Sequence, residues 1–283
     1  HIYTYNGLTY SADTYPNSGD INWSIIPSGD SEWMWTLNRM FGVLHIGRAW
    51  GYTFNPKYAY EYMAEYIDWI AENPKPFFKD TKNTWRTIEV GIRNHYPLLD
   101  SWNATLFSEE VTIQARITML KSNIEHMEYL SVYMGGGNWL IFESRGLYTL
   151  ASQHPEFKNS KFWADLALHR AFAQYFGQYK EDGWQYELTP NYHMEATNSL
   201  SEFEKIARLN NENTVLADGL TKAFRVEHVY TLPGGRAIPM NDTSLIDMRG
   251  VLRNSARLMG DFTQKIGEDY IYTATDYKAG KPP

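Results

Sequence analysis

Apolar residues recur every three or four positions along most of the chain, which is the spacing of one face of an α-helix. The first such stripe consists of Trp33, Leu37, Phe41 and Leu44, at intervals of four, four and three residues. A longer stripe runs through residues 113–134 and ends at three successive glycines, which are a strong helix stop signal. No stretch shows a convincing alternation of apolar and polar residues, so the pattern predicts an all-α protein.

Proline, glycine and asparagine divide this pattern into about nine predicted helices. They cover residues 33–44, 56–73, 83–96, 113–134, 138–153, 160–179, 192–209, 212–230 and 244–262. Short connections make neighbouring helices antiparallel, and such hairpins either stack as a solenoid or curl into an α/α toroid. We expect one domain over residues 1–265 and a linker or end segment over residues 266–283, whose last residues are polar and rich in proline.

The composition narrows the class of partner. Aromatic residues make up 16% of the chain, with 10 Trp and 21 Tyr. Their rings have flat apolar faces that match sugar rings, although the interior of the protein accounts for most of them. The formal net charge of -7 argues against nucleic acid, because phosphate binding needs a basic surface. An acidic polymer would need a locally basic cleft.

Several classes of site are missing from the sequence. The chain has no cysteine, so it has neither disulfides nor thiolate metal ligands. No apolar run approaches the roughly 20 residues that span a bilayer, and no signal peptide opens the chain at His1. No zinc-protease, serine-hydrolase or phosphate-loop motif is present, so we expect no metal and no cofactor. Glycoside hydrolysis by two carboxylates stays open, but no pair is singled out.

The most informative segment is DGWQYELTPNYH, residues 182–193. A turn leads into a polar stretch, and Pro190 then stands in the first turn of a helix, where its missing N–H costs little. Tyr192 and His193 therefore lie at the positive end of a helix dipole, which favours an anion. The segment also carries the side chains of Trp184, Gln185 and Glu187. The alternative is an ordinary loop with ordinary hydrogen bonds.

Polar side chains are also expected at two other helices. Asn138 follows the three glycines, where its amide either caps the helix or approaches a bound carboxylate across open backbone. One helix face carries Arg86, Glu89 and Arg93. It is either a solvated ion-pair stripe or the basic lining that an acidic sugar needs. Asn241, in a Pro-Met-Asn-Asp turn sequence, is a weaker candidate.

Together these residues resemble the toroid domain of heparinase II/III-type and alginate-lyase-type polysaccharide lyases, over nearly the whole chain. The catalytic tyrosine of that family lies in a segment DG-x-x-x-E-x-[ST]-x-x-YH, which residues 182–193 match with Tyr192 at the tyrosine. The family also has an Asn-His pair that opens a helix. Asn138 matches the asparagine, but Trp139 stands in place of the histidine. Shorter similar phrases occur at residues 85–89 and 157–160.

The resemblance implies an incomplete α/α toroid and β-elimination across the C4–O4 bond of a uronic acid. Asn138 would neutralise the uronate carboxylate and so make the C5 proton more acidic, with Arg86 or Arg93 as helpers. Tyr192 would take the C5 proton, donate one to the leaving O4, or do both, and His193 would orient or activate it. Substrate contacts are expected at Arg86, Glu89, Arg93, Trp139, Trp184, Gln185, Glu187 and Asn241.

The resemblance also implies an acidic polysaccharide or oligosaccharide as partner, and a periplasmic or secreted bacterial protein whose signal peptide is not in this chain. Family members normally continue into a β-sandwich domain, which this chain lacks. Trp139 either stacks on a sugar ring or packs in the core of the protein. Without the histidine, the chain is alternatively a glycan-binding domain without catalysis, and a glycoside hydrolase on an α/α toroid is a further alternative.

Overall fold

The computed structural model describes residues 2–11, 20–27, 29–212, 214 and 216–262. The chain forms two compact units, His1–Ala167 and Leu168–Pro283. Helices account for almost all regular structure of the described residues, which confirms the predicted all-α class. The predicted linker, residues 266–283, lies outside the described residues.

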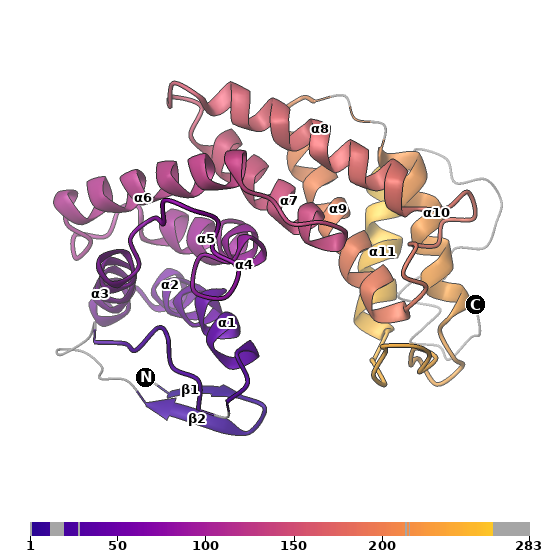
Figure 1. Cartoon of the computed structure of the whole chain (residues 1–283), viewed down its shortest axis with the longest axis horizontal. Helices are drawn as coiled ribbons and strands as arrows, with labels where there is room; N and C mark the ends of the chain where they lie inside the picture. Colours follow the sequence, from indigo (N-terminus) through magenta and orange to yellow (C-terminus); the bar gives the residue numbers. More distant parts are fainter. Residues whose placement is uncertain (1, 12–19, 28, 213, 215, 263–283) are drawn as a thin grey trace. The chain divides into compact units, whose positions relative to one another are not determined.

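The first unit consists of a short hairpin and a set of packed helices. Its elements are β1 (Ile2–Tyr5), β2 (Leu8–Ser11), α1 (Glu32–Asn38), α2 (Phe41–Thr53), α3 (Pro56–Glu72), α4 (Thr87–Arg93), α5 (Tyr96–Thr105), α6 (Ile113–Val132), α7 (Asn138–Gln153) and α8 (Ser160–Gln178), and the last contains the boundary between the units. Helix α2 packs against both α3 and α5, and the hairpin lies beside α1 (Figure 1).

The hairpin is an element that the apolar pattern did not predict. Its strands pair antiparallel, with Ile2 opposite Ser11 and Tyr5 opposite Leu8. Asn6 and Gly7, which connect the strands, have φ angles of 49° and 76°. Two positive φ values in a two-residue connection are typical of the hairpin turns that Asn-Gly favours. The dipeptide was therefore the local signal for this element.

The helix predicted over residues 33–44 is in fact a pair of helices, and α5 is a helix that the apolar pattern did not predict. The pair divides between α1 and α2 at Met40, which has a left-handed φ of 60°. The prediction that a helix ends before Pro97 is correct for α4, but Pro97 also stands in the first turn of α5. A proline stops a helix that precedes it in the chain, but it is tolerated in the first turn of a helix that follows. Pro97 is therefore compatible with both the end of α4 and the start of α5.

Helices α4 and α7 approach closely because glycines face each other where they meet. A Cβ on Gly91 would lie 2.7 Å from the Glu143 Cα, and a Cβ on Gly146 would lie 2.2 Å from the Gly91 carbonyl oxygen. Neither separation is sterically possible. The two glycines therefore fix how α4, with Arg86 at its start, lies against α7, with Asn138 at its start.

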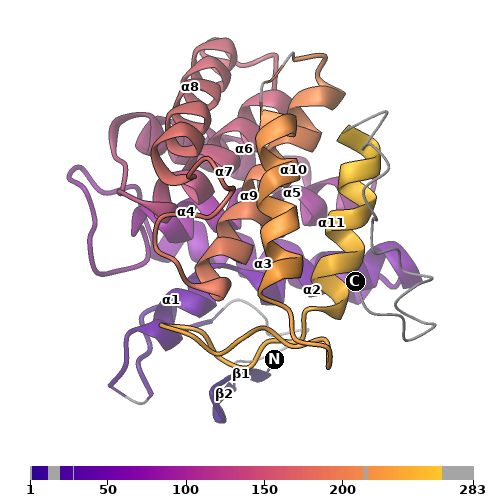
Figure 2. The ribbon, with the colours of Figure 1, turned by 90° about the vertical axis from the view of Figure 1, so that its right-hand side faces the viewer.

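The second unit contains the remainder of the helices, α9 (Pro190–Leu209), α10 (Leu216–Val229) and α11 (Arg249–Phe262), which stand side by side with α10 in the middle (Figure 2). A buried apolar cluster joins α9, α10 and α11 to the loop between the last two. It consists of Met194, Val226, Tyr230, Ala237, Met248 and Leu252. This cluster supports the start of α9, which carries Tyr192.

Candidate active site

Asn138 occupies the first position of α7, and Gly137 is the residue that caps this helix. Gly137 has φ 59° and ψ -140°, a conformation that only glycine adopts readily. The expectation that Asn138 caps the helix is therefore wrong. Its side chain is half-buried, and within the described residues its carboxamide forms no hydrogen bond. The amide is thus available to a ligand at the positive end of α7.

The glycine run before Asn138 is anchored by a buried carboxylate. The Gly135 N–H donates to both side-chain oxygens of Glu143, at 3.0 and 2.8 Å. A Cβ on Gly135 would lie 2.8 Å from one of these oxygens, so a larger residue would displace the Glu143 carboxylate. Glu143, which the sequence did not single out, fixes the backbone that leads to Asn138.

Arg86 and Glu89 form a buried ion pair and do not line a free surface. The Arg86 fork donates to the two Glu89 oxygens at 2.6 and 2.7 Å, and Arg39 donates to the same carboxylate at 3.0 Å. The Arg86 guanidinium lies over two indole rings, 3.4 Å from the centre of Trp35 and 4.8 Å from that of Trp139. Because Glu89 is fully buried, its predicted contact with substrate is wrong.

The contact with Arg86 places part of the Trp139 ring in the packing of the protein. The ring is half-buried, with the Arg86 guanidinium against it, so packing within the protein accounts for at least part of its surface. The N–H fork of Arg86, which could otherwise bind a substrate carboxylate, is occupied by the Glu89 carboxylate. The role of Arg86 here is to hold Trp139, the residue that follows Asn138.

Arg93 is fully buried, so the prediction that it helps bind substrate is wrong. Its guanidinium donates to His126 Nε2 at 2.9 Å and to the Thr84 carbonyl at 2.8 Å, and it lies 4.4 Å from the centre of the Trp69 ring. Burial lowers the pKa of Arg93 to about 9. Burial and the charge of Arg93 lower the pKa of His126, which is therefore neutral and can accept the hydrogen bond. Arg93 stabilises the interior of the first unit.

In the second unit, Tyr192 lies in the first turn of α9. Thr189 is the residue that caps this helix, and its hydroxyl accepts a hydrogen bond from the Tyr192 N–H at 3.3 Å. Pro190 follows at the first helical position, as the sequence predicted. The half-buried Tyr192 side chain donates its hydroxyl hydrogen to Oδ2 of Asp242 at 3.0 Å.

The loop that carries Asp242 is attached to the start of α9 on both sides of that residue. Asn241 donates through Nδ2 to the Leu188 carbonyl at 2.7 Å, and Thr243 Oγ1 accepts from the Asn191 N–H at 3.2 Å. Asn241 is exposed, but one end of its carboxamide is used in this attachment. Asp242 was missed by the sequence reasoning, which considered the turn and selected only Asn241.

His193 is fully buried, and neither ring nitrogen contacts the Tyr192 hydroxyl. Nδ1 accepts from the Gln185 N–H at 3.2 Å, and Nε2 lies 3.0 Å from the Ala223 carbonyl, to which it therefore donates. Burial lowers the pKa of His193 to about 4, so the ring is neutral. The prediction that it activates Tyr192 is wrong. His193 instead connects the segment of residues 182–193 to α10 through its hydrogen bond to Ala223.

The rest of the segment also forms the frame behind Tyr192. Gln185 is fully buried and donates to Gln178 at 3.1 Å and to the Glu187 side chain at 3.0 Å, so its predicted substrate contact is wrong. Glu187 is half-buried through this pairing. The ring of Trp184, also half-buried, packs edge-on against His193, with 5.4 Å between ring centres. These side chains hold the turn that precedes Tyr192, whose hydroxyl makes its hydrogen bond at an exposed position.

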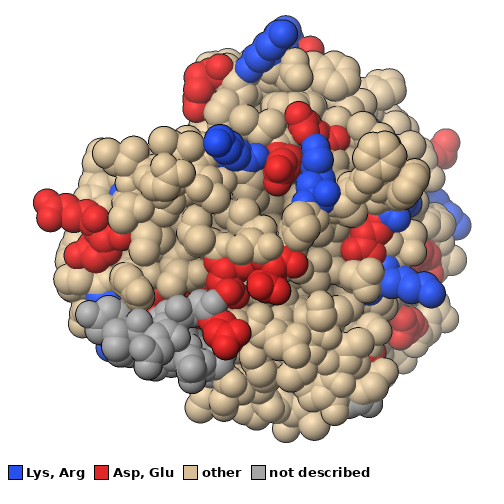
Figure 3. All heavy atoms as spheres, turned by 60° about the vertical axis from the view of Figure 1, so that its left-hand side comes forward, with Lys and Arg blue, Asp and Glu red and all other residues tan. Residues whose placement is uncertain are grey.

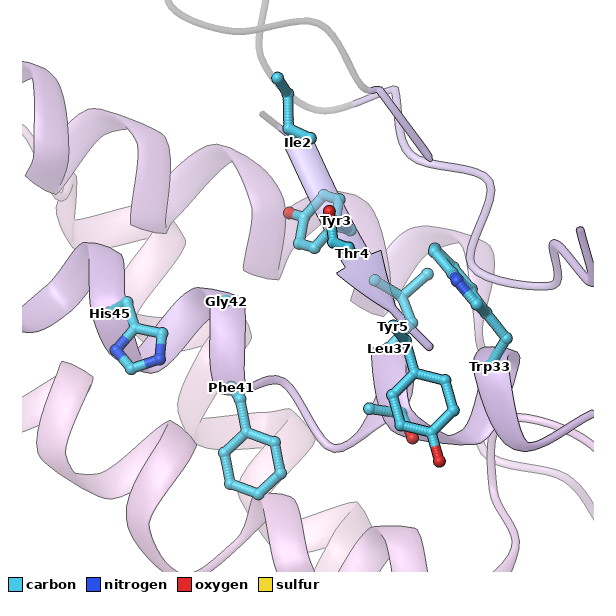
Figure 4. A pocket seen from close by; sticks show the side chains of 10 residues that line it. Ile2, Tyr3, Thr4, Tyr5, Trp33, Leu37, Phe41, Gly42 and His45 are labelled. Atoms are coloured by element: carbon cyan, nitrogen blue, oxygen red, sulfur yellow. The ribbon is translucent and has the colours of Figure 1, made fainter. Parts of the chain in front are cut away.

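Two surface hollows of the first unit lie apart from Asn138. One, of about 260 Å³, lies beneath the hairpin, where Tyr5, Trp33, Phe41 and His45 surround it (Figure 4). The other, of about 590 Å³, lies between Phe77 on the segment after α3 and the end of α6. Neither is lined by Asn138, Arg86 or Trp139.

One face of the molecule shows no basic patch that would attract a polyanion. Acidic side chains form a group in the middle of the face that Figure 3 displays, whereas basic side chains lie singly there. In the described part of the chain, no His, Asp and Glu side chains gather in a group that could hold a metal ion. No helix of that part has the length and apolar character needed to cross a membrane.

Comparison with known proteins shows that the chain is similar to a heparinase family and to heparin-sulfate lyases. The family model described as heparinase II/III N-terminus matches residues 2–266. The chain is 28% identical over 278 residues to a heparin-sulfate lyase of Pedobacter heparinus, covering 93% of this chain and 40% of that one. It is 26% identical over 286 residues to a heparin-sulfate lyase of Bacteroides stercoris, covering 93% and 42%.

A solved structure of heparinase III is similar with a TM-score of 0.81 and 25% identity, over 87% of this chain and 40% of that one. The predicted toroid class agrees with this likeness. The chain spans about 40% of the length of the curated relatives that it matches.

Proposed function

This chain belongs to the heparinase II/III N-terminus family, and from that membership we propose that it is the helical part of a polysaccharide lyase that cleaves a uronate-containing acidic polysaccharide by β-elimination. The observation that carries the proposal is the state of two polar groups at helix starts. Asn138 has a carboxamide without a hydrogen bond in the described residues, and Tyr192 has a hydroxyl that is partly exposed.

Asn138 has the chemistry for the first requirement of the reaction. The C5 proton of a uronate is weakly acidic because the adjacent carboxylate already carries a negative charge. A fixed amide donor, placed at the positive end of α7, would stabilise the extra charge that develops on this carboxylate as the proton leaves. The anchored glycine run before Asn138 keeps the amide in place without reorganisation.

Tyr192 has the chemistry for the second requirement. In the elimination the C5–H bond breaks, its electron pair forms the C4–C5 double bond, and the C4–O4 bond breaks with a proton delivered to O4. A phenol can take the first proton in its ionised form and donate one in its neutral form. In its neutral form, in which the hydroxyl donates to Asp242, Tyr192 can deliver a proton to O4. To take the C5 proton as well, Tyr192 would first pass its own proton to solvent, and the C5 proton that the phenolate then takes would be the one delivered to O4.

The names of the relatives and the Asn138 carboxamide both support one class of substrate. The relatives are named heparin-sulfate lyases, and a carboxamide is suited to a sugar carboxylate. We therefore propose heparan-type polysaccharides as the first substrates, with chondroitin-type polymers and alginate as the other uronates to compare.

The test is the ultraviolet absorbance of the unsaturated product, measured with the chain and with any longer polypeptide in which it occurs. Tyr192→Phe should lower the rate by at least about 100-fold, as expected for loss of a general acid or base. Asn138→Ala should cost a similar factor by loss of charge stabilisation. The exposed Tyr186→Phe and Asn103→Ala serve as matched controls and should retain the rate.

The other outcomes separate the alternatives. Reducing ends that appear without the new absorbance would indicate a hydrolase. Calorimetric binding of uronate oligomers without turnover would indicate a glycan-binding domain, the alternative that Trp139 in place of the family histidine favours. Either result would contradict the lyase proposal.

A further inference from the structure

Asp242 is the acceptor of the Tyr192 hydroxyl hydrogen, at 3.0 Å. The two residues are 50 positions apart, one on α9 and one on the loop after α10. We propose that Asp242 is a positioning residue for Tyr192, which fixes the direction of its hydroxyl in the protein before substrate binds. The proposal deepens the proposed lyase function and rests on it for its catalytic consequence.

The contact is built by the surrounding structure. Residues on both sides of Asp242 are attached to the start of α9, through Asn241 to the Leu188 carbonyl and through Thr243 to the Asn191 N–H. Leu188 adopts a left-handed φ of 55°, which costs free energy for its bulky side chain, whereas Asn241, with a φ of 54°, is a residue that tolerates this region. The strain at Leu188, whose carbonyl accepts the hydrogen bond from Asn241, indicates that the position of this loop relative to Tyr192 matters.

The other polar groups near Tyr192 in sequence are already used. His193 is neutral and bonded to Gln185 and Ala223, and the Glu187 side chain accepts from Gln185. Asp242, rather than one of these side chains, accepts the hydrogen of the Tyr192 hydroxyl. A phenol has one hydrogen, so directing it to Asp242 also sets where the oxygen lone pairs point.

The position of the phenol affects turnover more than binding. A reacting group displaced by about 1 Å can cost about 100-fold in rate. Asp242 itself needs no contact with the sugar, because its effect is transmitted through Tyr192. We therefore expect its loss to lower kcat and to leave KM nearly unchanged.

The experiment compares Asp242→Ala with Asp242→Asn in the protein as it occurs. Ala removes the acceptor and should lower kcat by about 10- to 100-fold. Asn retains a neutral acceptor in the same place and should recover about ten-fold of that loss, since a neutral hydrogen bond is weaker than one to a carboxylate but far better than none. Asp218→Asn, an exposed residue of α10, is the control for loss of one charge and should match the unchanged protein.

A second measurement does not depend on activity. Tyrosine labelled with ¹³C at Cζ gives a resonance for Tyr192, which is assigned by its absence in Tyr192→Phe. Removing a nearby negative charge makes a phenol ionise at lower pH, so both Asp242 variants should titrate earlier than the unchanged protein at this resonance, and Asp218→Asn should not.

The outcomes distinguish the two proposals. If no uronate polymer is cleaved but the Tyr192 resonance shifts in both Asp242 variants, the positioning contact is supported and the lyase proposal fails. The positioning proposal is overturned if the Asp242 variants leave the resonance unchanged. It is equally overturned if Asp242→Ala cleaves substrate with an unchanged kcat, or if it raises KM alone.

Discussion

Glu227 provides the sharpest test of the structure of the second unit. It lies on α10 and is fully buried, and one of its carboxyl oxygens accepts a hydrogen bond from the Ser255 hydroxyl of α11. The other oxygen has no hydrogen-bond partner, and no Lys or Arg forms an ion pair with Glu227, in the described part of the chain. Burial accordingly raises the pKa of Glu227 from 4.5 to about 8.

The pKa shift predicts how stability depends on pH. An unfolded Glu227 releases its proton near pH 4.5, whereas the folded protein retains it until about pH 8. Between these values the unfolded state binds fewer protons, so the free energy of unfolding falls as the pH rises, and it changes no further above pH 8. A shift of about 3.5 pH units corresponds to an upper bound of about 5 kcal/mol, at about 1.4 kcal/mol per unit.

Glu227→Gln removes this titration and retains an acceptor for Ser255. At pH 4 the two proteins should differ by about 1 kcal/mol or less, the net value of one hydrogen bond. At pH 8.5 the Gln variant should be the more stable by several kcal/mol, within the bound of about 5 kcal/mol set by the shift.

The assay is urea unfolding followed by circular dichroism from pH 4 to pH 9, with hydrogen exchange of the α10 and α11 amides to locate the effect in the second unit. Burial also raises the pKa of Glu65 in the first unit to about 8, but this contribution is the same in both proteins and cancels in their difference. Glu212→Gln, at an exposed position, is the control. A difference between wild type and Glu227→Gln that is constant across the pH range would refute the reasoning.

Four further substitutions test other parts of the structure. Gly91→Ala should destabilise the first unit by about 1–3 kcal/mol in urea unfolding, because its Cβ has no space against α7. Gly177→Ala, which has nothing within 4 Å of its Cβ, should stabilise α8 by about 0.5–1 kcal/mol, and equal effects of the two would contradict the helix contact. Thr189→Ala should cost about 1 kcal/mol through loss of the α9 cap, which a thermal shift measures; an unchanged Tm would be inconsistent with the cap. Arg86→Lys should lower thermal stability because Lys lacks the fork that binds both Glu89 oxygens, whereas full retention of Tm would show that the fork is unimportant.

The starts and ends of helices were largely predictable because short-range backbone chemistry decides them. Asn55 followed by a proline begins α3, with the Asn55 side chain accepting from the Lys57 N–H. Thr189 with Pro190 begins α9 in the same way. The Asn6-Gly7 turn carried an equally local signal for the hairpin. The family segment belongs to this class too, since its residues are close together along the chain.

The sequence determined that this chain is helical, that it belongs to a lyase-related family, and that Tyr192 and Asn138 are its best chemical candidates. The tertiary structure decided which neighbours of these residues face inward. Helical spacing placed Arg86, Glu89 and Arg93 on one face, but it contained no information on what covers that face. The answer depends on partners tens of residues away, such as Trp35 on Arg86 and Asp242 on Tyr192. Backbone preferences act over a few residues, whereas burial and hydrogen-bond pairing are set by which distant segments pack together.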